Sequence, residues 1–215
     1  MADSLKDDNK LALYGLMAAN LALFYVAVQK DTIMTGDWIE LARHLGEAIP
    51  AGIGIALTGI INAQFSPEAK FRIVFMRWHN SLPGCEAFTR HAKADPRVNI
   101  ASIERVCGSL PTDPQQQNAL WYRLYKSVES EPAVVQIHRA FLFARDYTCL
   151  ALLMTVVLGV AGLLQIPSKR IALIFVAVLL LQFLFAGQAA RNNGKRFVTT
   201  VLAIKGAGKL GGSNE

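Results

Sequence analysis

The sequence predicts an all-α integral membrane protein. Four transmembrane helices form two pairs, and a helical cytoplasmic domain is inserted between the second and the third. Two observations predict this class. The chain of 215 residues is 53% hydrophobic and only 18% charged, whereas soluble domains carry about 25% charged residues. The hydrophobic residues also gather in four blocks that contain no Asp, Glu, Lys or Arg, which are residues 11–29, 49–65, 147–166 and 171–188.

Each block has the length of a membrane span. A helix rises 1.5 Å per residue, so about 20 residues cross the roughly 30 Å of hydrocarbon in a bilayer. Lipid cannot satisfy backbone hydrogen bonds, so a spanning segment must be helical. The blocks therefore divide the chain into four regions. These are residues 1–65 with a leader and the first two spans, 66–146 as the cytoplasmic domain, 147–190 with the last two spans, and 191–215 as a basic, flexible cytoplasmic tail.

The N-terminal block is interpreted as a retained helix rather than a cleaved signal peptide. Its leader mixes acidic and basic residues, and no small-residue cleavage pattern follows the apolar run. The three cysteines, Cys85, Cys107 and Cys149, are odd in number and irregularly spaced, which indicates a reducing compartment rather than a disulfide framework.

The distribution of Lys and Arg predicts the orientation, because these residues remain on the cytoplasmic side of a membrane. With four crossings, the leader, the central segment and the tail share one side, which holds 18 basic residues against 4 on the other. We therefore expect an inner-membrane protein with both termini and the central domain in the cytoplasm.

The pI of 9.4 does not by itself indicate nucleic-acid binding. The central segment holds eleven basic and eight acidic residues, and the orientation bias already explains the positive sign. Anionic lipid headgroups are the nearer partner, since each Lys or Arg near the surface contributes about 1 kcal/mol to lipid binding. We expect the lipid bilayer as a partner and no nucleic acid.

The segments outside the spans show their own helix signals. Residues 1–9 are polar and are expected to be loose. Asp37 is a candidate N-cap for a short periplasmic helix at the interface, and Pro67 opens an amphipathic helix with Phe71, Val74, Phe75 and Trp78 on one face. Further helices are predicted over 100–107, ended by Gly108, and over 114–126. From Pro132 no break precedes the third span.

Small and amide side chains in the spans are the candidates for helix packing or for lining a pore. Small residues allow close helix approach, and buried amides form hydrogen bonds between helices. The second span is the richest in such residues and is expected to be the central packing helix of a homo-oligomer. The candidates are Asn20, Gly52, Gly54, Ala56, Thr58, Gly59, Asn62 and Gln182.

Aromatic and basic residues of the cytoplasmic domain are the candidates for contact with a protein partner or with lipid. Trp, Tyr and Arg are enriched at interfaces between proteins. The candidates are Arg72, Arg77, Trp78, Trp121, Tyr122, Tyr125, His138, Arg139 and Arg145.

No constellation indicates a catalytic, cofactor or metal site. His79, Cys85, His91 and Cys107 lack the C-x₂₋₄-C spacing of structural zinc sites. A Cys–His nucleophile pair has no recognisable orienting carboxylate, and the Gly-x-Gly-Lys of the tail is not a phosphate loop, because no Ser or Thr follows the Lys. We expect a protein without enzymatic activity, metal or cofactor.

Three functions compete. The first is a membrane protein whose cytoplasmic domain binds or senses a cytoplasmic protein partner. The second is an oligomeric channel or membrane-permeabilising effector gated by that domain, and the third, least favoured, is an enzyme acting on lipid. No charged residue lies within a predicted span, which argues against an ion-coupled transporter. The layout is similar to that of small bacterial inner-membrane proteins encoded with defence or plasmid-exclusion systems, although no diagnostic motif accompanies it.

The predicted orientation can be tested with an introduced cysteine. A cysteine placed at Pro111, within the cytoplasmic domain, should resist a membrane-impermeant thiol reagent in intact cells and react after lysis. Labelling is compared with that of the parent chain, which carries the three native cysteines. Labelling of the new cysteine in intact cells would place the central segment outside.

Overall fold

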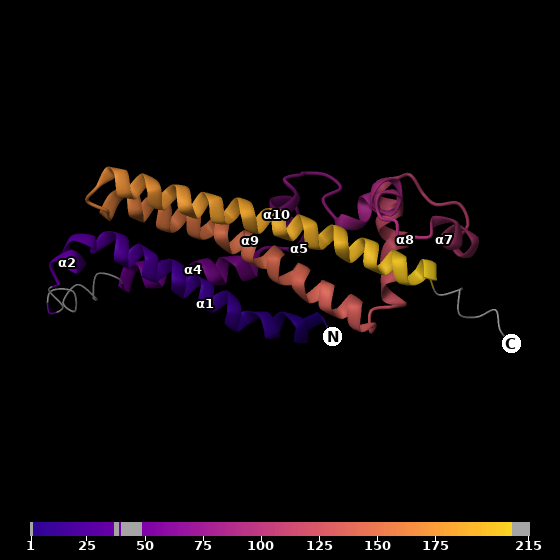
Figure 1. Ribbon diagram of the computed structural model, residues 1–215, viewed down its shortest axis with the longest axis horizontal. Helices are drawn as coiled ribbons and strands as arrows, with labels where there is room; N and C mark the ends of the chain where they lie inside the picture. Colours follow the sequence, from indigo (N-terminus) through magenta and orange to yellow (C-terminus); the bar gives the residue numbers. More distant parts are fainter. Residues whose placement is uncertain (1, 37–38, 40–48, 208–215) are drawn as a thin grey trace. The chain divides into compact units, whose positions relative to one another are not determined.

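The computed structural model describes residues 2–36, 39 and 49–207, and it is helical throughout its regular structure (Figure 1). The regular structure of the described residues consists of helices alone, with no strand. The predicted all-α class is therefore confirmed.

Among the described residues, three helices are long and apolar enough to span a membrane. They are α1 (Ala2–Val28), α9 (Pro132–Gln165) and α10 (Lys169–Ala207), and their apolar stretches coincide with the first, third and fourth predicted spans. The second predicted span forms α4 (Ile49–Gln64), whose 16 residues measure about 24 Å at 1.5 Å per residue. The four-span topology thus stays a prediction.

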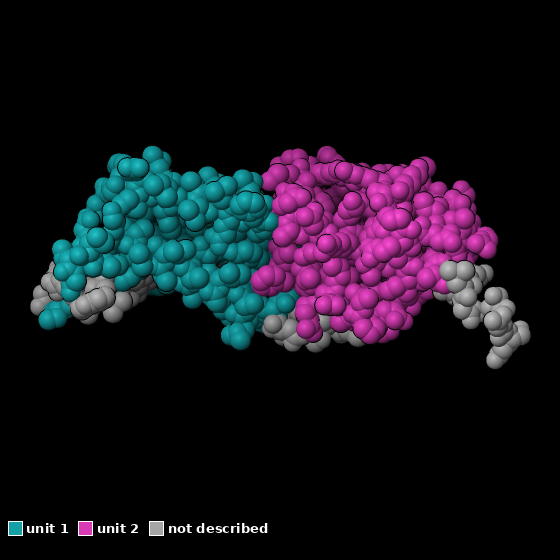
Figure 2. Space-filling model, in the orientation of Figure 1, with its two compact units in different colours: residues 1–66, 145–187 teal, residues 67–144, 188–215 magenta. Residues whose placement is uncertain are grey.

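The chain divides into two compact units (coloured separately in Figure 2). Unit 1 comprises residues 1–66 and 145–187, and unit 2 comprises residues 67–144 and 188–215. The boundary between residues 144 and 145 falls inside α9, and the boundary between residues 187 and 188 falls inside α10. The first segment of unit 2 nearly coincides with the domain predicted over 66–146, but the unit also includes the C-terminal part of α10, which the sequence did not assign to it.

In unit 1, α9 and α10 form an antiparallel hairpin closed by a short turn after Gln165 (Figure 1). Leu150, Met154 and Leu158 of α9 are buried against the same cluster as Phe175 and Leu179 of α10, together with residues of α1. The close approach occurs at Gly162, where a Cβ atom would lie 2.9 Å from the Phe175 ring. Gly162 lies in the third predicted span and was not among the predicted packing residues.

Many large apolar side chains of unit 1 face outwards. Leu11, Leu164 and Phe185 are 83%, 80% and 71% exposed. So many exposed large apolar side chains suit contact with lipid chains.

Two N-terminal expectations need comment. The leader, predicted to be loose, is helical from Ala2, because its polar residues continue the first apolar helix without a Gly or Pro to interrupt it. The helix breaks at Gln29, and α2 (Lys30–Thr35) follows and ends at Gly36, whose φ of +72° is favoured by glycine. The helix predicted from Asp37 lies outside the described residues.

Unit 2 is built from short helices, from the N-terminal part of α9 and from the C-terminal part of α10. In chain order it contains α5 (Pro67–Phe75), the 3₁₀ helix η2 (Pro83–Glu86), the π-helical turn η3 (Ala87–His91), α6 (Ala92–Ala94), α7 (Ile100–Cys107) and α8 (Pro114–Lys126). The bounds predicted for α7 and α8 are confirmed. Asn99 caps α7 by accepting from the Ser102 backbone N–H at 3.0 Å, and Asp113 caps α8 through Gln116 at 2.9 Å.

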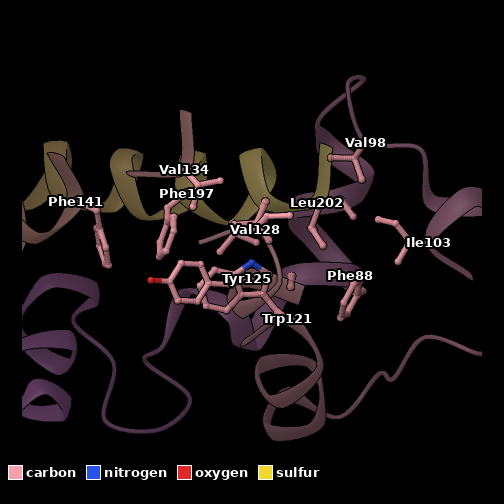
Figure 3. Packing of buried hydrophobic residues seen from close by; sticks show 14 residues of the cluster. Phe88, Val98, Ile103, Trp121, Tyr125, Val128, Val134, Phe141, Phe197 and Leu202 are labelled. Atoms are coloured by element: carbon pink, nitrogen blue, oxygen red, sulfur yellow. The ribbon is translucent and has the colours of Figure 1, made fainter. Parts of the chain in front are cut away.

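The core of unit 2 is aromatic, and the C-terminal part of α10 completes it (Figure 3). The Phe197 ring stacks on His138 with centroids 4.7 Å apart and meets Trp121 edge-on at 5.2 Å. Val198, Val201 and Leu202 of the same helix are buried completely.

The expectation of a flexible tail over 191–215 is therefore wrong for residues 191–207. Basic residues along this stretch suggested a solvated tail, yet Phe197, Val198, Val201 and Leu202 recur at helical spacing between them and fill the core of unit 2. Residues 208–215 lie outside the described part.

Truncating Phe197 tests this role of α10. Phe197→Ala should lower the stability of unit 2 by about 3–5 kcal/mol, because it leaves a cavity among Trp121, Tyr125 and His138. Thermal unfolding of the detergent-purified chain, followed by Trp fluorescence, measures the change. Arg196→Ala, at an exposed neighbouring position, is the control. Equal melting of both variants would mean that residues 191–207 are not part of a folded unit.

Candidate functional site

The candidate site begins where α5 ends. Met76 has a φ of +51°, which ends the helix after Phe75, and Asn80 has the same φ. A non-glycine residue in the left-handed region is uncommon, and two within five residues mark a tightly specified loop. Trp78 therefore does not continue the helical stripe predicted for it but lies in the loop, 79% exposed.

After the loop, η2 packs closely on α8. A Cβ atom added at Gly84 would lie 2.5 Å from the Asn118 side-chain oxygen and 2.8 Å from the Trp121 ring. These distances are shorter than any ordinary contact, so only glycine allows η2 to come this close. Pro83 and Cys85 on either side are buried.

Gln117 of α8 fixes η3 in place. Its side chain is 1% exposed, and its Oε1 accepts hydrogen bonds from the Phe88 N–H at 3.0 Å and from the Thr89 N–H and hydroxyl at 3.1 Å each. Its Nε2 donates to the Thr112 carbonyl at 2.8 Å. The N–H groups at the start of a helical turn have no partner within the turn, and the Gln117 carboxamide oxygen accepts from two of them.

The loop, η2, η3 and the C-terminal half of α10 surround a cavity of about 390 Å³, which we call the basic cavity. Its volume falls in the range of small-molecule sites, about 300–1,000 Å³. Its lining is mainly polar and includes four cationic side chains and one carboxylate. The polar lining residues are Arg77, Asn80, Ser81, Glu86, Arg90, His91, Gln188, Arg191, Asn192 and Lys195.

Glu86 pairs with two of the four cations. Its carboxylate contacts the Arg77 guanidinium at 2.6 Å and that of Arg90 at 3.0 Å. Burial acts to raise the pKa of Glu86, but the hydrogen bonds from Arg77 and Arg90 outweigh it, and the pKa lies below its ordinary value. Glu86 is therefore ionised at neutral pH and cannot act as a general acid.

The other two cations belong to α10 and have no carboxylate partner within the described part of the chain. Arg191 donates to the Val74 carbonyl at 2.8 Å and to the Gln188 side chain at 3.1 Å, so neutral acceptors hold its guanidinium in place. Lys195 lies one helical turn further and is exposed. The basic cavity therefore carries a net positive charge.

His91 adds an unmet hydrogen-bonding group to the cavity wall. The residue is 9% exposed, and its buried Nδ1 has no partner. Burial lowers the pKa of His91, as do the nearby cations Arg90, Lys195 and Arg77, whereas Glu86 opposes the shift. The imidazole is thus neutral at pH 7, and an unpaired buried nitrogen costs about 1–3 kcal/mol.

The contact residues predicted from the sequence do not gather in one site. Arg77 lines the basic cavity, whereas Arg72 and Trp78 line a second cavity of about 330 Å³ on another side of the loop. Tyr122 is 50% exposed, and Arg139 is exposed.

Several of these predicted contacts are internal instead. Trp121 and Tyr125, at 5% and 8% exposure, belong to the core of unit 2, and His138 stacks within it. Arg145, 6% exposed, lies in unit 1 and pairs with Asp146 at 2.9 Å. Their aromatic and charged character suggested a surface, but apolar neighbours on other helices enclose them, which helix periodicity alone does not show.

Among the packing or pore candidates, the structure describes four. Asn20 is 2% exposed and donates to the Leu16 carbonyl at 2.8 Å, while its Oδ1 has no partner. Asn62 is also buried with an unpartnered Oδ1, Gln182 donates to the Tyr147 hydroxyl, and Ala56 is exposed. The surroundings of Gly52, Gly54, Thr58 and Gly59 lie outside the described part, so the role of the second span as the packing helix stays a prediction.

The Cys85 thiol is not activated. Cys85 is 3% exposed, and burial raises the pKa of its thiol, which disfavours the thiolate needed for attack or metal binding. Within the described ranges, no three His, Cys, Asp or Glu side chains come close enough to hold a metal ion.

Comparison with protein-family models, with curated proteins and with solved structures finds no match to this chain.

Glu86, Arg90, His91, Arg191 and Lys195 are the cavity residues that the sequence analysis did not assign to a site. One signal was present, because Arg191 and Lys195 are four residues apart and share a helix face. This spacing is informative only if the last helix continues beyond residue 188. It was overlooked because residues 191–215 were predicted to be a flexible tail.

The buried imidazole predicts a pH dependence of stability. The pKa of His91 is lowered in the folded state, so the unfolded state binds the proton first, and stability falls as the pH decreases below about 6.5. One proton gives a slope of at most about 1.4 kcal/mol per pH unit. His91→Phe should flatten this decline between about pH 6.5 and the folded-state pKa.

Thermal unfolding between neutral and mildly acidic pH measures this slope in the parent and the variant. His79→Phe, at an exposed position, is the control. An unchanged slope in His91→Phe would show that the imidazole titrates as freely in the folded chain as in the unfolded one.

Proposed function

We propose that this chain is a non-enzymatic inner-membrane protein that binds a cytoplasmic protein partner through unit 2. The spans serve as its anchor, and unit 2 faces the cytoplasm with both termini. The layout shared with small inner-membrane proteins of bacterial defence or exclusion systems supports this class of function.

The observation that carries the proposal is the exposed apolar loop after α5. Trp78 and Met76 are 79% and 59% exposed, and the loop that holds them is anchored rather than slack. Arg77, between them, pairs with Glu86 at 2.6 Å, and the positive φ angles of Met76 and Asn80 fix the backbone. An anchored loop loses little conformational entropy on binding, and a solvent-exposed Trp is a typical centre of a protein interface.

The surface beside the loop suits a protein partner. The second cavity places Trp78 next to the ion pair of Arg72 and Glu68, whose atoms are 3.0 Å apart. A polar rim around an aromatic anchor is the common arrangement of protein interfaces. Cys85 also lines this cavity, but burial raises the pKa of its thiol, which disfavours its use as a nucleophile.

Replacing Trp78 tests the proposal. Trp78→Ala should reduce partner binding at least about tenfold, because central Trp residues commonly contribute 2 kcal/mol or more to an interface. The full chain is purified in mild detergent from its own cells, and a photocrosslinking residue at position 78 captures whatever touches the loop. Capture of a soluble protein of one defined mass, lost on competition with the unmodified parent chain, supports the proposal.

Position 106 provides the matched control. Val106 of α7 is 61% exposed, so Val106→Ala removes exposed apolar surface elsewhere on unit 2 and should leave binding unchanged. Crosslinks at position 78 only to lipid, or to nothing, would contradict the proposal. A conductance of the purified chain in planar bilayers that survives Trp78→Ala would favour the channel function instead.

A further inference from the structure

We infer that the basic cavity of unit 2 is a binding site for a phosphate-bearing ligand. This site goes beyond the proposed partner binding and does not depend on it, since Trp78 does not line the basic cavity. Three independent features of the cavity carry the inference.

The first feature is a pair of cations that have no anionic partner among the described residues. Arg191 and Lys195 lie one turn apart on α10, and both face the cavity. Arg191 is held by the Val74 carbonyl at 2.8 Å and by Gln188 at 3.1 Å. A guanidinium that neutral acceptors position, with its charge uncompensated, is prepared for an anion and needs little reorganisation to bind it.

The second feature is the opposite wall, where Glu86 holds Arg77 and Arg90 together. The carboxylate binds one guanidinium with each oxygen, at 2.6 and 3.0 Å. One carboxylate balances only one of the two charges. With Arg191 and Lys195 the four cations exceed the single carboxylate by three, and all of them line one cavity of about 390 Å³.

The third feature is the unmet hydrogen-bonding capacity of His91. His91 lines the cavity, and its buried Nδ1 has no hydrogen-bond partner among the described residues. A buried polar atom without a partner needs an explanation, and a ligand atom that completes the hydrogen bond is one. A neutral imidazole can donate a hydrogen bond to a ligand oxygen, and Asn80 and Asn192 also line the cavity and carry side-chain N–H donors.

Together these features select phosphate over other anions. A phosphoryl group has three terminal oxygens and up to two negative charges, so it can use several guanidinium, ammonium and imidazole donors at once, whereas a carboxylate has two oxygens and one charge. A cavity of about 390 Å³ suits a small molecule or a single headgroup. An extended nucleic-acid backbone would instead require a basic groove that follows it.

Two sources could supply this chemistry, a soluble phosphate compound or a phospholipid headgroup. The full chain is reconstituted in nanodiscs of phosphatidylcholine, and inorganic pyrophosphate is titrated by calorimetry at constant ionic strength. In the second arm, native mass spectrometry measures the phosphatidic acid retained by the chain. Binding of pyrophosphate indicates a soluble ligand, whereas retention of phosphatidic acid without pyrophosphate binding indicates a headgroup, and either result supports the site.

Matched variants assign the binding to the cavity. Lys195→Gln removes an exposed cation from the wall and should weaken binding about tenfold, whereas Arg105→Gln, an equal charge change at an exposed position of α7, should not alter it. His91→Phe should weaken binding several-fold without lowering the melting temperature of the ligand-free chain. Absence of binding by both probes, or equal effects of Lys195→Gln and Arg105→Gln, would overturn the inference, while crosslinking at position 78 reports on the partner separately.

Discussion

The buried carboxamide of Gln117 is the interaction on which the arrangement of unit 2 depends. It joins two segments about thirty residues apart by accepting three hydrogen bonds from Phe88 and Thr89 and donating one to Thr112. A buried polar group without a hydrogen-bond partner is costly, so this arrangement is stable only when all four hydrogen bonds form together. Gln117 therefore selects one placement of η3 on α8, and no apolar residue could replace it.

That placement determines the cavity. With η3 fixed on α8, Gly84 allows η2 to approach the same helix, and Glu86 and His91 are carried to the wall that faces α10. The chain between Phe75 and Pro83 must then span a set gap, which explains why Met76 and Asn80 adopt positive φ angles despite their steric cost. The exposed position of Trp78 is a consequence of the same constraint.

The sequence allowed much of this fold to be predicted, where a local signal was sufficient. Asp113-Pro114 and Gly108 mark ends of α8 and α7 correctly, and Pro132 opens a helix that runs unbroken to Gln165. Prediction failed where the outcome depends on distant contacts. Residues 191–207 are helical because Phe197 and Leu202 find a core supplied by α8 and α9, and Gln117 looks in the sequence like one of three solvated glutamines. The basic cavity could not be predicted for the same reason, because its lining comes from both η3 and α10.

The basic residues after the last apolar block have two explanations that the structure helps to separate. Positive charge at the cytoplasmic end of a span orients the protein in the membrane, and any Lys or Arg in contact with headgroups would serve. Orientation alone does not require a precise position. Arg191 is nevertheless bonded to the Val74 carbonyl from a segment 117 residues away in the chain, and Ala190 and Gly194 beside it are buried. Charge that only orients a helix would not need this fixed geometry, whereas charge that receives a ligand would.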